Sequence, residues 1–170
     1  MMMLVVYLAP FYAAELGLDL AKIGFIFFLA RLWDAAIDPL VGNLSDLSNT
    51  RLGRRKPWII CGLPLLMFST FFLLQPPPTV TISYLAIAVA VFYLAITIVQ
   101  IPYLSWGVEI SRDYIERIRV NGFREAGTMA GILLVAGIPL IFFMGKEPTI
   151  AELVEIIAYV VLVLLPLTFI

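Results

Sequence analysis

Histidine is absent from this chain of 170 residues, cysteine occurs once, and charged residues make up only 14 % of the sequence. With Cys61 alone and no histidine, the chain lacks the ligand sets of zinc and iron–sulfur sites and any Cys–His pair for nucleophilic catalysis. The 11 basic and 12 acidic residues leave a net charge of −1, whereas nucleic acid requires a basic surface. We therefore expect no cofactor and no nucleic-acid partner.

Hydrophobic residues make up 62 % of the chain, and its mean hydropathy is +1.04. A water-soluble domain carries about 25 % charged residues, so the solvent that this composition fits is a lipid bilayer. Charged and Pro- or Gly-rich breaks leave six apolar runs, at 1–14, 23–45, 57–74, 80–106, 126–144 and 151–170. The predicted fold class is an all-α membrane protein with six transmembrane helices that form one bundle over residues 1–170.

Lysine and arginine gather in the second and fourth connections, at Arg51, Arg54, Arg55, Lys56, Arg112, Arg117 and Arg119. The positive-inside rule then places both chain ends in the cytoplasm. We expect a multi-pass protein of the cell (inner) membrane. The first run would span only roughly 21 Å, and the last ends without a polar cap. We therefore expect that part of the first helix and everything after the sixth are missing, although a short natural open reading frame would look the same.

The run 23–45 carries three ionisable residues at depths where such groups are costly and indicate function. Arg31, Asp34 and Asp38 are spaced i, i+3, i+7 and share one helix face near the bilayer midplane. Two carboxylates one turn apart can share a cation, one of them can carry a proton, or Arg31 can neutralise part of the pair. This chemistry is that of a carrier coupled to Na⁺ or H⁺.

Other interpretations of the acidic pair remain open. The three residues can form a structural ion-pair network, in which case the chain is a truncated, non-transporting membrane protein or a scaffold. A catalytic dyad for intramembrane proteolysis fits poorly, because both acids lie on one helix and no other catalytic group accompanies them. We expect a protein that is not an enzyme.

The run 80–106 offers candidate solute contacts. Gln100 precedes Pro102, which frees the carbonyl of Ile98 for a ligand or water, and Tyr103 supplies a ring on which a sugar can stack. The structural alternatives are helix packing for Gln100 and a place in the aromatic belt at the membrane interface for the ring of Tyr103. Arg124 at the start of the run 126–144 either contacts solute or extends to the headgroups.

Two further patterns concern helix packing. Asp46 ends one predicted helix and Arg54 and Arg55 precede the next, so these charges can latch two helix bundles on the cytoplasmic side. The basic residues alone also satisfy the positive-inside rule. Gly127 and Gly131 form a small-residue stripe that predicts close helix packing.

R-L-W-D-A-A-I-D-P-L-V-G-N-L-S-D at 31–46 and T-R-L-G-R-R-K-P-W at 50–58 strongly resemble the glycoside-pentoside-hexuronide:cation symporters of the major facilitator superfamily, of the melibiose-permease type. Q-I-P-Y-L-S-W at 100–106 and E-R-I-R-V-N-G-F-R at 116–124 add weaker support. The resemblance implies a carrier of two six-helix bundles, of which this chain is the N-terminal one. Its partners would be membrane lipid, a sugar or related small solute, and the missing half.

By the same resemblance, Asp34, Asp38 and Thr97 match the cation site of the family. Ile37 replaces an asparagine of that site, which weakens the case for Na⁺ and strengthens that for H⁺, and both ions stay open. Gln100 stands where the melibiose carrier has a sugar-binding aspartate. Leu104 stands where that carrier has a sugar-stacking tryptophan. The departures at Gln100 and Leu104 argue against melibiose and leave the solute open, from glycosides and uronates to lipids.

Overall fold

The computed structural model describes residues 2–51, 53–77, 79–109, 113–142 and 149–167, and all named elements in these ranges are helices. They are α1 (Met2–Ala14), α2 (Leu20–Leu47), α3 (Lys56–Leu74), α4 (Ile82–Glu109), α5 (Tyr114–Phe142) and α6 (Ile150–Leu167). The sequence predicted six helices in this order, and that number is confirmed.

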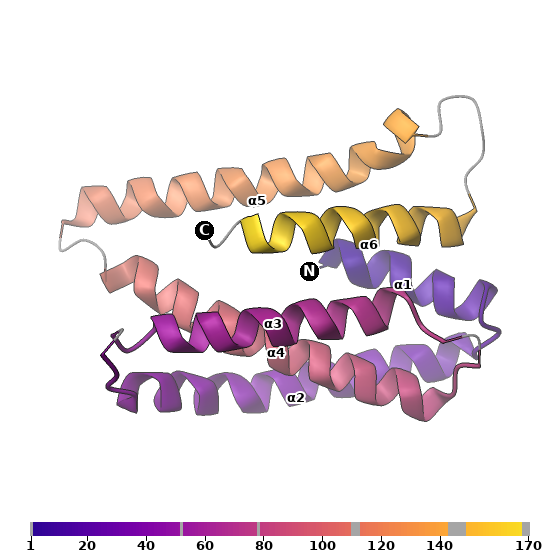
Figure 1. The fold of residues 1–170 in the computed structure, drawn as a ribbon, viewed down its shortest axis with the longest axis horizontal. Helices are drawn as coiled ribbons and strands as arrows, with labels where there is room; N and C mark the ends of the chain where they lie inside the picture. Colours follow the sequence, from indigo (N-terminus) through magenta and orange to yellow (C-terminus); the bar gives the residue numbers. More distant parts are fainter. Residues whose placement is uncertain (1, 52, 78, 110–112, 143–148, 168–170) are drawn as a thin grey trace.

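The helices run along the long axis of the molecule and alternate in direction (Figure 1). The most extensive contacts join α3 to α4 and α2 to α4, α6 packs on α3 and α1, and α5 lies at the edge beside α6. The core forms where α1, α2, α3, α4 and α6 meet, and its fully buried members include Leu8, Tyr12, Ile23, Leu73, Leu85, Val89, Val154 and Ala158. The hydroxyl of Tyr12 donates a hydrogen bond of 2.8 Å to the carbonyl of Leu73 and ties α1 to the end of α3.

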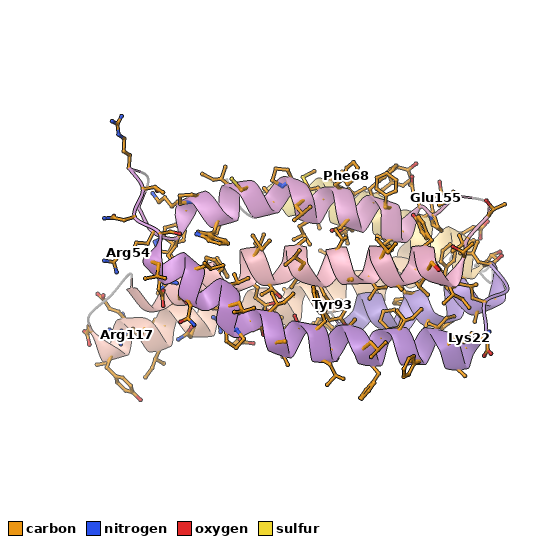
Figure 2. The ribbon with its side chains drawn as sticks, turned by 90° about the horizontal axis from the view of Figure 1, so that it is seen from below. Lys22, Arg54, Phe68, Tyr93, Arg117 and Glu155 are labelled. Carbon is orange, nitrogen blue, oxygen red and sulfur yellow. The ribbon has the colours of Figure 1, made fainter. Side chains whose placement is uncertain are left out.

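The alternation places the connections at two opposite ends. Figure 2 shows Arg54 and Arg117 at one end of the molecule and Lys22 and Glu155 at the other. The second and fourth connections therefore share an end, as the charge pattern requires.

The start of the fifth helix differs from the prediction. We expected a charged connection up to Arg124 and a helix from 126, whereas α5 begins at Tyr114. Asp113 caps the N-terminus of α5: its Oδ1 accepts a hydrogen bond of 3.1 Å from the backbone N–H of Ile115. Charged residues end a membrane span but not a helix, since a helix can continue into water. Residues 1, 143–144 and 168–170, which the predicted runs included, lie outside the described residues.

Two helices in the described part of the chain are long and apolar enough to cross a membrane, Lys56–Leu74 and Ile82–Gly107. The 13 residues of α1 reach about 20 Å, less than the hydrocarbon thickness. In α2 the helix is continuous, but charged residues interrupt its apolar sequence. Large apolar side chains are nevertheless exposed along α2 and α3, among them Phe25, Trp33 and Phe68.

Among the described glycines, Gly62 has the least room for a side chain, at the contact of α3 with α4. A Cβ atom there would lie 2.7 Å from Cγ2 of Ile98 and 2.8 Å from Cγ2 of Val99. At Gly127 and Gly131 a Cβ atom would meet no described neighbour within 4 Å, so the close packing predicted for that stripe is wrong within this structure. The sequence signal was a glycine spacing, whereas close approach also needs a neighbouring helix.

Candidate functional site

The contact between α2 and α4 brings the middle of α2 against Thr97. The side chain of Asp34 is 16 % exposed, and its Oδ1 accepts a hydrogen bond of 3.0 Å from the buried Thr97 hydroxyl. The same hydroxyl lies 3.1 Å from the carbonyl oxygen of Tyr93. A hydroxyl carries one proton, so Thr97 can donate to only one of these acceptors at a time. When the proton turns to Tyr93, the Thr97 oxygen is free to bind a cation.

Arg31 holds the other oxygen of the same carboxylate. Its Nη1 lies 3.0 Å from Oδ2 of Asp34, while the arginine side chain is 62 % exposed. The guanidinium carbon also lies 6.0 Å from the centroid of the Tyr93 ring, within the range of a cation–π contact. Asp34 is therefore partnered on both oxygens.

A cavity of about 320 Å³ lies over this pair, lined by Arg31, Asp34, Asp38, Thr97, Gln100 and Ile101. Asp38 is half-buried in it and makes no hydrogen bond or ion pair with any residue that the structure describes. The lining contributes one basic and two acidic side chains, which leaves one negative charge without a counter-charge. Carboxylate and hydroxyl oxygens suit a hard monovalent cation or a proton.

Both helices that line the cavity carry a proline directly after a lining residue. Pro102 is fully buried in α4 and leaves the carbonyl of Ile98 without its usual helical donor. Pro39 in α2 does the same for the carbonyl of Ala35, beside the acidic pair. The sequence pattern pointed only to the proline of α4, whereas α2 carries one as well.

Two predicted solute contacts do not line this cavity in the described structure. Tyr103 is 39 % exposed on α4, one turn beyond Gln100. Arg124 lies on α5 and pairs with its neighbour Glu125 at 3.1 Å. Of the candidate solute residues, Gln100 is the one that the fold places beside the acidic pair.

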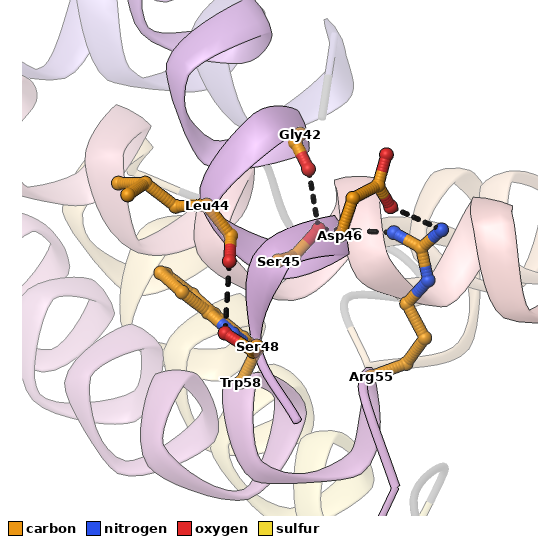
Figure 3. A network of polar contacts seen from close by, with 7 residues as sticks. All are labelled: Gly42, Leu44, Ser45, Asp46, Ser48, Arg55 and Trp58. Carbon is orange, nitrogen blue, oxygen red and sulfur yellow. Dashed lines mark hydrogen bonds and ion pairs between the residues drawn. The ribbon is translucent and has the colours of Figure 1, made fainter. Parts of the chain in front are cut away.

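The predicted cytoplasmic charges form a network at the junction of α2 and α3 (Figure 3). Nη2 of Arg55 pairs with Oδ1 of Asp46 at 2.5 Å, and Nη1 donates to Oγ of Ser45 at 2.9 Å. Ser45 is fully buried and donates to the carbonyl of Gly42 at 2.9 Å. Arg54 points into solvent, so the ion pair that the structure shows is made by Arg55.

The turn between α2 and α3 directs Arg55 toward this network. Thr50 and Gly53 pair across the turn, and Gly53 has a φ of +96°, a conformation that favours glycine. Nε1 of Trp58 donates to Oγ of Ser48 at 2.8 Å, which binds the first turn of α3 to the end of α2.

Sequence reasoning missed two residues of these sites. Tyr93, under Arg31, precedes Thr97 by four residues, and that helical spacing was a usable signal. Ser45 neighbours Asp46, but nothing in the sequence showed that it would be buried as an acceptor for Arg55.

Comparison with known proteins decides the family. The family model described as MFS/sugar transport protein matches residues 1–170, the whole chain. The chain belongs to this family. Its members are transport proteins, so this MFS chain is an integral membrane protein of a transport family.

Curated relatives of this MFS chain are named symporters. An uncharacterized symporter of Synechocystis is 36 % identical over 154 residues, which cover 80 % of this chain and 28 % of the relative. The inner membrane symporter YicJ of Escherichia coli is 31 % identical over 146 residues, or 83 % of this chain and 32 % of the relative. The sodium-dependent lysophosphatidylcholine symporter 1 of Gallus gallus is 32 % identical, over 76 % of this chain and 23 % of the relative.

These matches confirm the glycoside-pentoside-hexuronide:cation symporter family expected from the sequence. The chain spans 23–32 % of the length of the three relatives named above. No solved structure matches the chain.

Proposed function

We propose that this chain is the N-terminal six-helix part of a symporter that moves a small solute together with Na⁺ or H⁺ by alternating access. The observation that carries the proposal is Asp38, an acid without a described partner in the cavity that Asp34 and Thr97 also line. A half-buried carboxylate is costly unless a cation or a proton neutralises it. One monovalent ion would leave the lining of the cavity neutral.

The coupling ion would lie between the two carboxylates. Asp34, Asp38 and the Thr97 hydroxyl supply its ligands, and Thr97 would then donate its proton to the Tyr93 carbonyl, 3.1 Å away. No group of three or more His, Cys, Asp and Glu gathers among the described residues, so the arrangement suits a monovalent ion better than a divalent one.

The solute would bind between this bundle and the other half, next to the ion. Gln100 is our first candidate contact, because it lines the same cavity, and Tyr103 and Arg124 are candidates that would need helix movement or the missing half. We propose that the solute is a sugar or a related polar molecule. The protein would lie in the inner membrane, with both chain ends on the cytoplasmic side. The Asp46–Arg55 pair would lie at the cytoplasmic end and break as the bundles rock.

Cation binding by the purified protein tests this function. We expect Asp38→Asn and Asp34→Asn to lose a charge-assisted contact of about 1.5–3 kcal/mol, which weakens Na⁺ or H⁺ binding about 10- to 100-fold. Glu155→Gln, on the exposed face of α6, is the matched control and should bind as the wild type does. Titration calorimetry with Na⁺ at fixed pH, and proton uptake measured without Na⁺, separate the two ions.

The outcomes distinguish transport from a structural role. Loss of binding with unchanged helicity and unchanged elution from a sizing column supports the proposal. If both variants lose folded protein, the acidic pair is structural; if both fold and bind as the wild type does, the coupling site lies elsewhere.

A further inference from the structure

Arg31 forms an ion pair with the carboxylate of Asp34, which is also a proposed ligand of the coupling ion. Its Nη1 lies 3.0 Å from Oδ2 of Asp34, so the ion-free cavity contains one neutralised and one unneutralised acid. An ion bound between Asp34 and Asp38 would share the single negative charge of Asp34 with the guanidinium. The guanidinium and the bound cation are both positive, so they repel each other when they contact the same carboxylate.

The surroundings of Arg31 allow it to give way. The side chain is 62 % exposed, whereas that of Asp34 is 16 % exposed, so the arginine is the partner with room to move. The face of the buried Tyr93 ring, 6.0 Å from the guanidinium carbon, offers a second attraction that does not depend on Asp34. Among the described residues that line the cavity, Arg31 is the one basic group.

We propose that Arg31 is a tethered competitor of the coupling ion: it neutralises Asp34 while the site is empty and yields that charge when the ion binds. This inference rests on the proposed function. Arg31 would thereby keep the cation affinity moderate, so that the ion can leave again on the other side of the membrane. It would also prevent two unpaired carboxylates from facing each other in the empty site.

The sign of the effect separates this role from a structural one. A structural ion pair that orients Asp34 predicts that removal of Arg31 weakens cation binding. A competitor predicts the reverse, because the same carboxylate becomes fully available. For charges a few ångströms apart at a partly exposed site, we expect Arg31→Gln to tighten binding by about fivefold to tenfold.

The experiment is a Na⁺ titration of the purified protein by calorimetry, with proton uptake measured in parallel without Na⁺. Arg31→Gln should bind Na⁺ with a lower Kd, or take up protons at a higher pH, than the wild type. Arg31→Lys keeps a competing charge and should stay within about twofold of the wild type. Arg119→Gln removes an exposed arginine of α5 outside the cavity lining and should leave binding unchanged.

Unchanged or weaker binding in a folded Arg31→Gln variant overturns the competitor role while leaving the symporter proposal intact. Absence of both Na⁺ binding and proton uptake in the wild type would overturn both. If Arg31→Gln fails to fold, the Kd of Arg31→Lys for Na⁺ is measured at low and at high ionic strength instead. Competition predicts that this Kd remains near that of the wild type under both conditions. A Kd for Arg31→Lys that is weaker by tenfold refutes competition and shows that the guanidinium fork itself orients Asp34.

Discussion

Gly62 is the position at which the packing of α3 on α4 can be tested most directly. A Cβ atom there would lie 2.7 Å from Cγ2 of Ile98 and 2.8 Å from Cγ2 of Val99. Attractive contacts between carbon atoms lie at about 3.5–4.0 Å, so the methyl group of Gly62→Ala requires α3 and α4 to separate or both side chains to turn. Isoleucine and valine keep one χ1 rotamer in about 90 % of helical cases, which makes turning costly. We expect Gly62→Ala to destabilise the protein by about 1–3 kcal/mol.

A matched glycine separates this overpacking from the general effect of alanine in a helix. At Gly127 a Cβ atom would meet no described neighbour within 4 Å, and alanine there gains up to about 1 kcal/mol in helix propensity. The free energies of unfolding are measured by titration with sodium dodecyl sulfate, followed by circular dichroism. Adding Val99→Ala to Gly62→Ala should recover part of the loss, with a coupling of about 0.5–3 kcal/mol. If Gly62→Ala unfolds as Gly127→Ala does, α3 and α4 do not approach as closely as this structure shows.

Three further variants test the connections between helices. Tyr12→Phe removes the hydrogen bond to the Leu73 carbonyl and should lower the free energy of unfolding by about 1 kcal/mol in the same titration; no change would mean that water replaces the hydroxyl. Arg55→Lys keeps the charge but loses the two-point contact with the end of α2, so its thermal midpoint should fall, whereas that of Arg54→Lys should stay; equal midpoints would contradict the network in Figure 3. Gly53→Ala imposes a side chain at a φ of +96° and should cost about 1–2 kcal/mol, and full stability would show that the turn changes shape.

Apolar runs predicted the helices because each is bounded by polar or Pro-rich breaks that are visible in the sequence. The run 57–74 falls within one residue of α3 at both ends, and the run 151–170 starts one residue after the first residue of α6. The run 126–144 missed the beginning of α5 at Tyr114, because hydropathy locates the lipid-compatible part of a helix and not its hydrogen-bonded ends. A helix cap such as Asp113 was the signal available there.

The candidate site divides in the same way between local and long-range information. The spacing of Arg31, Asp34 and Asp38 follows from helical geometry, and the structure keeps all three on one cavity. The contact between Asp34 and Thr97 joins residues 63 apart in the chain, and only the family resemblance pointed to it. The choice of Arg55 over Arg54 depends on the turn at Gly53, whose direction a sequence of adjacent arginines does not specify.

The packing of α3 also bears on the cation site, because Ile98 and Val99 directly follow Thr97 on α4. The Cβ of Gly62→Ala would be about 0.8 Å short of an ordinary contact of roughly 3.5 Å, and α4 carries Thr97 with it if the helices separate. A binding site tolerates displacements of only about 0.5 Å. We therefore expect Gly62→Ala to weaken Na⁺ or H⁺ binding several-fold in the folded fraction, while Gly127→Ala leaves it unchanged. Equal binding in a destabilised Gly62→Ala variant would instead show that α3 yields alone and that α2 and α4 hold the site without it.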